Sequence, residues 1–255
     1  MTILSDEVSA MAIVETERLT KIYGKAETAV TALDGVSLRI EPGEFVAVMG
    51  PSGCGKSTLL HLIGGLDRPT SGRVLVDGDD LARLDDTTLT ELRRRRIGFV
   101  FQFFNLIPVL RADENAALPM ILDGVKPAEA RSRAAEWLRR VGLTDRLDHR
   151  PDQLSAGQQQ RVAIARALAT QPALILADEP TGNLDSRASD EIAGLLRQAC
   201  DDWNQTVLMV THDPRIAAYS DRIVFLKDGT IVDETLLAGN GQSEAQLVRK
   251  KMEAL

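Results

Sequence analysis

The sequence predicts an α/β fold in which a parallel sheet is joined to an antiparallel β-subdomain and interrupted by a helical insertion. Three apolar runs, Ile97–Phe101, Ala173–Ala177 and Val207–Thr211, have the composition of parallel strands buried on both faces of a sheet. A fourth run, Phe45–Met49, leads through a glycine-rich loop into an apolar helix. The stretch from about residue 103 to residue 170 shows mostly helical patterns instead.

Further strands are predicted near both ends of the chain. They lie at Ile13–Leu19, Val36–Ile40, Arg73–Val76, Ile223–Lys227 and Thr230–Asp233. The last two flank an Asp-Gly pair, which favours the positive φ of a tight hairpin. Because these strands are separated by turns, we expect an antiparallel sheet formed near the two ends.

Three helices are predicted between these strands. They cover Thr58–Ile63 after the glycine-rich loop, Lys126–Val141 with a proline at its start and a glycine at its end, and Gln158–Thr170 before a Gln-Pro pair. The simplest organisation is a single domain in which the helices from 103 onward form an insertion.

The expected domain boundaries follow from this organisation. The α/β core with its β-subdomain covers 12–102 and 171–235, the helical subdomain covers 103–170, and 1–11 and 236–255 are terminal extensions of one domain over 1–255. The polar segment before Met11 is either a frayed extension or the result of a misassigned start at Met1.

A phosphate-binding loop of the pattern G-x-x-x-x-G-K-[ST] lies at 50–57. Its glycines let backbone N–H groups turn inward around phosphates, Lys56 supplies a positive charge, and the Ser57 hydroxyl is placed to ligate Mg²⁺. The helix that begins here points its N-terminus at the anion. The residues expected to contact the nucleotide are Gly50, Pro51, Ser52, Gly53, Cys54, Gly55, Lys56, Ser57 and Thr58. The sequence therefore predicts a nucleoside triphosphate site.

An apolar strand ends in two adjacent carboxylates, Asp178 and Glu179. A charge at the end of a buried strand is costly without a partner, and we expect Mg²⁺, held opposite Ser57, to be that partner for Asp178. Glu179 is placed to orient and polarise an attacking water. The alternative is a solvent-facing acidic turn, an interpretation that the phosphate loop makes weaker.

A second anion-binding helix start is predicted at Ser155. Small residues, Ala156 and Gly157, follow this serine, as at a helix N-terminus whose backbone N–H groups are accessible to an anion. The chain therefore carries two elements suited to phosphate.

The composition limits the possible functions. A net charge of −7 over 255 residues argues against general binding to nucleic-acid backbones. No apolar run reaches the roughly 18 residues that cross a bilayer, and the start lacks a signal-peptide pattern, so we expect a cytoplasmic protein. Cys54 and Cys200 are too few for a disulfide framework. The basic run Arg93–Arg96 is interpreted as the solvated end of a helix, with contact to acidic lipid headgroups as the alternative.

Together, the motifs resemble those of ATP-binding cassette (ABC) ATPases. The matching segments, in the order seen in that family, are Gly50–Ser57, Gln102, Leu154–Gln158, Leu176–Glu179, Gly182–Asp185 and His212. The resemblance covers the chain from about Ile13 to Asp233. It implies a P-loop ATPase core with a β-subdomain and a helical subdomain, and ATP and Mg²⁺ as cofactors.

The resemblance implies roles for residues of the core. Tyr23 is similar to the aromatic residue that stacks on adenine, with a half-buried structural tyrosine as the alternative. Gln102 matches a glutamine that contacts Mg²⁺ and the attacking water. His212 matches a histidine at the γ-phosphate. With Lys56 and Glu179, Gln102 and His212 complete the expected catalytic set.

The resemblance also implies that two chains share each site. Ser155 and Gly157, with Gln158 beside them, match signature residues that touch the γ-phosphate of ATP held by another subunit. Asp185 matches a loop that communicates between the two sites. Ala156 departs from the commoner glycine, a change that puts affinity across the interface, but not activity, in doubt.

A biological role follows from the resemblance. It implies the ATP-hydrolysing subunit of a bacterial transporter, pairing with a second ABC subunit, as a homodimer, and with integral membrane permease subunits at the cytoplasmic face of the membrane. The runs at 101–108 and 181–185 are similar to those of the macrolide-export and lipoprotein-release group, so we expect export or membrane extraction. The alternative is a cell-division or signalling complex that transmits force without moving a substrate.

Two further expectations concern single segments. Phe103–Leu110 is either the docking surface for the permease or a packing element of the helical subdomain. Cys54 lies near a helix N-terminus, where the thiolate is favoured, so we expect alkylation to block nucleotide binding and ATP to protect against it.

Overall fold

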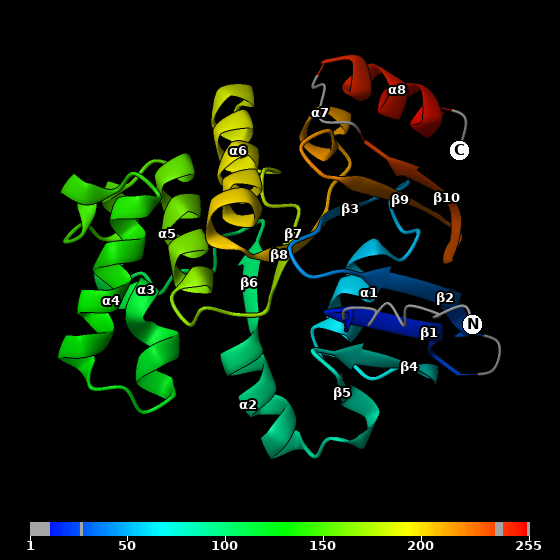
Figure 1. The fold of residues 1–255 in the computed structure, drawn as a ribbon, viewed down its shortest axis with the longest axis horizontal. Helices are drawn as coiled ribbons and strands as arrows, with labels where there is room; N and C mark the ends of the chain where they lie inside the picture. Colours follow the sequence, from blue (N-terminus) through cyan, green and yellow to red (C-terminus); the bar gives the residue numbers. More distant parts are fainter. Residues whose placement is uncertain (1–10, 26–27, 238–241, 254–255) are drawn as a thin grey trace, which may run out of the picture.

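The computed structural model describes residues 11–25, 28–237 and 242–253. The question of the start at Met1 concerns residues outside this range. The larger of two sheets has six strands in the order β10-β9-β3-β8-β7-β6 (Figure 1). Its members are β3 (Phe45–Met49), β6 (Ile97–Phe101), β7 (Leu174–Asp178), β8 (Thr206–Val210), β9 (Arg222–Lys227) and β10 (Thr230–Leu236). All neighbours are parallel except β9 and β10.

The smaller sheet is antiparallel and has the order β2-β1-β4-β5. It consists of β1 (Val14–Tyr23), β2 (Val30–Ile40), β4 (Ser71–Val76) and β5 (Asp79–Asp80). The predicted antiparallel sheet is therefore confirmed for the N-terminal strands, and the predicted C-terminal hairpin is confirmed as the antiparallel pair of β9 and β10. The expectation that this hairpin belongs to the antiparallel sheet is wrong, because it lies at the edge of the larger sheet. Its first strand, β9, pairs in parallel with β3, because the residues 223–226 are buried on both faces and belong inside the central sheet.

Eight α-helices are present among the described residues. They are α1 (Lys56–Ile63), α2 (Asp86–Arg96), α3 (Ala112–Leu122), α4 (Pro127–Arg140), α5 (Ala156–Leu168), α6 (Ser186–Trp203), α7 (Pro214–Ala217) and α8 (Gln242–Glu253). The three predicted helices correspond to α1, α4 and α5. The helices α3 and α6 were not predicted, and α8 lies in the segment expected to be a terminal extension.

Alternate residues of the central sheet point to opposite faces, as the pleat requires. Phe45, Ala47 and Met49 of β3 belong to the core shared with α3–α6. Val46 and Val48 belong to the other core, shared with α1 and the smaller sheet. Figure 1 shows the same layers, with α1 on one side of the central strands and α5 and α6 on the other. The helices α1 and α5 thus cover opposite faces.

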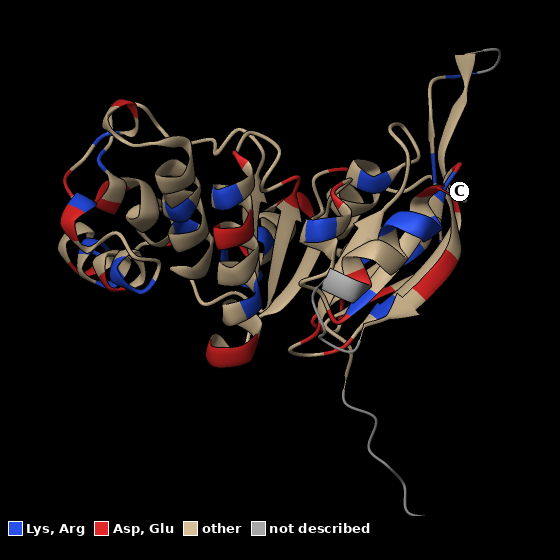
Figure 2. Ribbon diagram, turned by 90° about the horizontal axis from the view of Figure 1, so that it is seen from above, with Lys and Arg blue, Asp and Glu red and all other residues tan. Residues whose placement is uncertain are grey.

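The arginines at the end of α2 have partners within the chain. Arg93 donates to the carbonyl of Gly65 at 2.7 Å, and Arg95 pairs with Asp123 at 2.9 Å. Arg96 pairs at 3.2 Å with Asp77, which lies in the turn after β4 of the smaller sheet. These contacts favour the interpretation as the end of a helix over a headgroup site. Figure 2 shows that basic and acidic positions are interspersed along the helices and strands.

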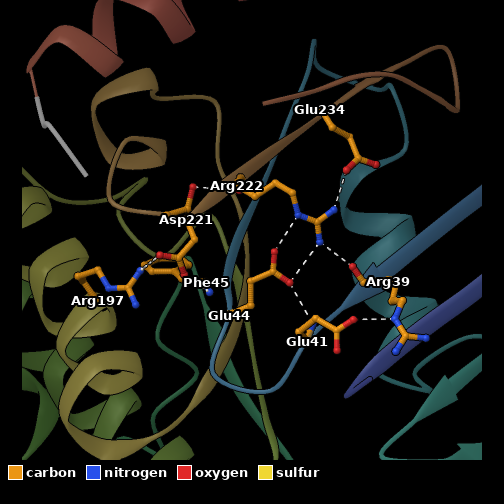
Figure 3. Close-up of polar contacts among 9 residues, drawn as sticks. Arg39, Glu41, Glu44, Phe45, Arg197, Asp221, Arg222 and Glu234 are labelled. Carbon is orange, nitrogen blue, oxygen red and sulfur yellow. Dashed lines mark hydrogen bonds and ion pairs between the residues drawn. The ribbon is translucent and has the colours of Figure 1, made fainter. Parts of the chain in front are cut away.

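A cluster of ion pairs lies at the amino ends of β3 and β9 (Figure 3). Arg222 pairs with Glu44 at 2.8 Å, and Arg197 of α6 pairs with Asp221 at 2.8 Å. Asp221 also accepts from the backbone N–H of Phe45 at 2.8 Å. These contacts connect β3, β9 and α6 at the amino ends of the strands. The predicted site lies at the opposite, carboxyl ends of the strands.

Candidate functional site

The carboxyl ends of four neighbouring parallel strands carry the predicted catalytic residues. The phosphate loop follows β3, Gln102 follows β6, Asp178 ends β7 with Glu179 next, and His212 comes two residues after β8. Parallel strands end at a common edge, which is where ligands bind in open α/β sheets. The fold therefore brings together residues that are up to 162 positions apart between Gly50 and His212.

The backbone of the phosphate loop requires glycine at several positions. Gly53 and Gly55 have φ of 81° and 105°, which side chains rarely adopt. A Cβ atom at Gly50 would lie 2.7 Å from Cys54 Sγ and still closer to the carbonyl oxygen of Leu226. The glycines thus allow the tight turn that ends at the first residue of α1.

Lys56 lies across the loop that precedes it. Its Nζ donates to the carbonyl oxygens of Gly50 and Pro51, each at 2.8 Å, and the residue is 9% exposed. The ammonium group is therefore positioned inside the loop, together with the N-terminus of α1. Both features favour an anion at this place.

Ser57 and Asp178 meet beside the loop. The Ser57 hydroxyl donates to Asp178 Oδ1 at 3.1 Å, and His61 Nε2 of α1 is 4.0 Å from Oδ2. Within the described part of the chain, no group of three or more His, Cys, Asp or Glu side chains is arranged to hold a metal ion. A hydroxyl and one carboxylate nevertheless fit Mg²⁺, which usually completes its shell with water and substrate phosphates.

Glu179 and His212 form a close pair. His212 Nδ1 is 3.0 Å from both carboxylate oxygens of Glu179. The Glu179 backbone has φ of 47°, a left-handed conformation that is costly for a residue with a Cβ. Its backbone N–H donates to the carbonyl of Val210 at 3.0 Å, which ties the strained residue to the end of β8.

Gln102 is held by Asn183, a residue quoted in the motif but not among the predicted contacts. Gln102 Nε2 donates to Asn183 Oδ1 at 3.3 Å, and Asn183 Nδ2 donates to the Gln102 carbonyl at 2.9 Å. A Cβ atom at Gly182 would lie 2.8 Å from Gln102 Nε2. The Gly-Asn pair thus fits directly against the predicted catalytic glutamine.

Ser155 begins α5 with a reciprocal cap. The Gln158 N–H donates to Ser155 Oγ at 3.3 Å, and the Ser155 N–H donates to Gln158 Oε1 at 3.0 Å. Asp185 likewise caps α6 by accepting from the N–H of Ala188 at 2.9 Å. Residues 155–158 and Asp185 line one open cleft of about 410 Å³. The structure therefore brings the two predicted interface motifs together.

Tyr23 lies at the end of β1, with 42% of its surface exposed. Its hydroxyl donates to Asp67 Oδ2 at 3.0 Å, and the ammonium of Lys21 is 4.9 Å from the ring centroid. Burial opposes ionisation of Asp67, but the hydrogen bonds from Lys21, the Arg68 backbone and Tyr23 outweigh it and lower the pKa of this carboxyl. The half-exposed ring therefore has a fixed orientation.

Cys54 differs from the expectation of a favoured thiolate. The residue is 5% exposed, and burial raises the pKa of its thiol even though Lys56 Nζ is 3.9 Å from Sγ. Desolvation outweighs the nearby positive charge and the helix terminus. The expected thiolate is therefore wrong, whereas the effect of alkylation on nucleotide binding stays a prediction.

Sequence reasoning missed three residues that hold the site. Asn183 pairs with Gln102, and Asp67 holds Tyr23. Gln160 of α5 is completely buried, and its amide donates to the backbone beside two predicted catalytic residues. Asn183 was visible as part of a motif. The other two have no local signal, because their partners are distant in the sequence.

Comparisons with known proteins agree with this geometry. The ABC transporter family model matches residues 33–182. An uncharacterized ABC transporter ATP-binding protein of Thermotoga maritima is 54% identical, over 83% of this chain and 90% of that relative. The lipoprotein-releasing system ATP-binding protein LolD of Geobacter metallireducens is 50% identical, over 86% and 98%. The macrolide export ATP-binding/permease protein MacB of Hyphomonas neptunium is 46% identical, over 92% of this chain and 36% of that relative.

A solved structure is similar over the same range. This structure is the dimeric structure of a post-hydrolysis state of the ATP-binding cassette MJ0796 bound to ADP and Pi. Its TM-score is 0.81 and its sequence identity is 49%, over 88% of this chain and 98% of that chain. The fold and the loop define a P-loop nucleoside triphosphatase. Within that class, the chain belongs to the ABC transporter family and is an ATP-binding cassette ATPase.

Proposed function

We propose that this chain works as a homodimer that binds two ATP molecules between its subunits and drives a separate membrane permease. The observation that carries this proposal is the position of α1 and α5 on opposite faces of the central sheet. The phosphate loop precedes α1 and Ser155 begins α5. Two head-to-tail copies would complete each site, and such a pair closes by two-fold symmetry.

The residues at the strand ends have distinct roles in this proposal. Lys56 and the loop N–H groups bind the phosphates, and Ser57 and Asp178 would hold Mg²⁺, which neutralises phosphate charge when bound. Glu179 accepts a proton from the attacking water. His212 fixes the Glu179 carboxylate by the 3.0 Å contact and faces the γ-phosphate. Gln102 would contact the attacking water and the bound metal.

The remaining predicted contacts are divided between the two halves of each site. Tyr23 stacks on adenine in its own subunit. Ser155, Gly157 and Gln158 contact the γ-phosphate of the partner's ATP, and Asp185 connects the two sites. The helical subdomain that presents the three signature residues covers 103–170, inserted into a core of 12–102 and 171–235.

Export or extraction from a membrane is the transport activity that we propose. Two of the reported relatives are named as a macrolide export ATP-binding/permease protein and a lipoprotein-releasing system ATP-binding protein, which favours this over a complex that only transmits force. No helix of the described residues is long and apolar enough to span a membrane. Attachment to the cytoplasmic face of the membrane would come from the permease.

The Glu179→Gln substitution tests the shared site. The amide keeps the size of the side chain and cannot take the proton, so ATP binding remains while hydrolysis stops. We expect this variant to elute as a dimer with saturating Mg-ATP and as a monomer without it, in size-exclusion chromatography. Lys56→Ala, which loses phosphate binding, is the control that stays monomeric. A Glu179→Gln variant that is monomeric with bound ATP contradicts the proposal.

A further inference from the structure

Gln160 of α5 is a buried side chain that no motif explains. It is 0% exposed, and its Nε2 donates to the carbonyl of Pro180 at 2.7 Å and to the carbonyl of Phe101 at 3.3 Å. Pro180 directly follows Glu179, and Phe101 directly precedes Gln102. One amide therefore bridges the two backbone segments that carry the predicted water-activating residues.

The bridge also reaches the helix that begins at Ser155. Gln160 lies five residues after Ser155, about one and a half turns into α5. Gln160 is thus part of the helix that would contact the partner's ATP. Its side chain also hydrogen-bonds to the two backbone segments that carry Gln102 and Glu179 in its own subunit.

The energetics of this amide point away from a role in packing alone. Its Oε1 atom is buried and has no hydrogen-bond partner among the described residues. Burying an unpaired carbonyl oxygen lowers stability, whereas an apolar side chain of similar shape would carry no such oxygen. What Gln160 adds over an apolar residue is the pair of N–H donors.

Both acceptors lie where backbone position matters. The Pro180 carbonyl belongs to the residue after Glu179, whose φ of 47° is strained and must be held by its surroundings. The Phe101 carbonyl also accepts from the N–H of Phe104, at 3.3 Å, at the turn that contains Gln102. Displacement of the Glu179 carboxylate or of the Gln102 amide by about 1 Å would reduce catalysis strongly.

We infer that Gln160 is a positioning residue that couples the signature helix to Glu179 and Gln102. The inference rests on the proposed roles of those two residues. The amide holds the two segments at a fixed separation, so that movement of α5 toward a partner's nucleotide is transmitted to the backbone beside both catalytic side chains.

The test compares Gln160→Met with Gln198→Met in the full-length protein. Methionine has nearly the shape of glutamine and no N–H donor. Gln198 is an exposed residue of α6, and its side chain donates to the Asp202 carboxylate one turn away, at 3.0 Å. We expect Gln160→Met to lower kcat about tenfold or more, with KM for ATP and the Kd for ATP within about twofold of native. ATP-dependent dimerisation is retained, and Gln198→Met behaves as native.

A merely structural role gives a different result. It lowers the melting temperature and leaves kcat within about twofold of native below that temperature, which would overturn the inference. A raised KM with unchanged kcat also overturns it. If Gln160→Met does not fold, Gln160→Asn replaces it, because the shorter amide cannot reach both carbonyls, and the same criteria apply.

The control Glu179→Gln separates this inference from the proposed function. If Glu179→Gln stops hydrolysis and Gln160→Met does not slow it, only the role of Gln160 is wrong. If Glu179→Gln hydrolyses ATP as the native protein does, the assignment of the catalytic residues is wrong, and the inference fails with it.

Discussion

The two thiols of the chain are shielded in the same way although they lie in different cores. Cys54 is 5% exposed and Cys200 is 6% exposed. Burial raises the pKa of Cys54 and raises the pKa of Cys200 to about 12. Because the thiolate is the nucleophile, we expect both thiols to react slowly at neutral pH.

We expect iodoacetamide at pH 7.5 to modify neither thiol in the native protein, with both modified after unfolding in urea, as measured by peptide mass spectrometry. The sign of the linked stability follows. Unfolded thiols ionise near pH 8.5 while Cys200 stays protonated to about pH 12, so the native state binds more protons over this interval. The free energy of unfolding therefore falls as pH rises across it. Rapid labelling of folded protein at neutral pH would contradict the burial argument.

Single residues show where sequence reasoning about the site stops. Asp178 and Glu179 were predictable, because two carboxylates that end an apolar strand need a partner. The pKa of Cys54 was not, since a helix terminus and a lysine favour the thiolate and only the three-dimensional burial reverses the balance. The bonds of Gln160 were not predictable either, because they reach carbonyls 59 and 20 residues away.

At the scale of elements, the segment 103–110 packs in part against the helical subdomain, and its role as a docking surface stays a prediction. Leu106 packs against the larger core, while Phe103 and Val109 are 72% and 71% exposed. Arg166 of α5 donates to the carbonyls of Phe104 and Asn105, both of which have left-handed φ. The segment is therefore held by α5 and exposes apolar side chains to solvent, which is a feature of docking surfaces.

Phe103→Asp tests this surface. A charge in the contact would oppose docking, so we expect much less co-purification with the detergent-solubilised permease while circular dichroism shows a native fold. Val232→Asp is the matched control, because this exposed valine lies on β10, in a different part of the chain. Equal recovery of the permease with both variants would exclude Phe103 from the interface.

The elements themselves were unevenly predictable. The helix α6 is predictable from two local features of the sequence. These are the capping residue Asp185 and the helical spacing of the apolar residues Ile192, Leu195, Leu196 and Ala199. The pairing of β9 with β3, in contrast, has no local signal in the sequence. A hairpin turn is a local feature, but the choice of β3 as the other neighbour depends on tertiary packing that the hairpin sequence does not specify.

At the scale of the whole molecule, the proposed division of each ATP site between two subunits leads to a complementation experiment. Lys56→Ala removes the phosphate loop of a chain, and Ser155→Arg blocks its signature. Neither variant should hydrolyse ATP alone, because neither homodimer contains an intact site. Mixing them creates heterodimers with one native loop facing one native signature. Activity should return to at most about half of the native rate, because one of the two sites in each heterodimer is intact. Malachite-green phosphate release measures this. If mixing restores no activity, the signature and the loop do not complete one site in trans.

If the opposite placement of α1 and α5 divides each site between two subunits, as proposed, ATPase activity depends on the concentration of the protein. When the dimer is the only competent form, dilution removes the site itself, even at saturating ATP. Turnover per chain then rises with protein concentration until pairing is complete. A permease that holds two copies side by side would raise their effective concentration and relieve this dependence. Hydrolysis by free chains would in this way remain low until they are assembled.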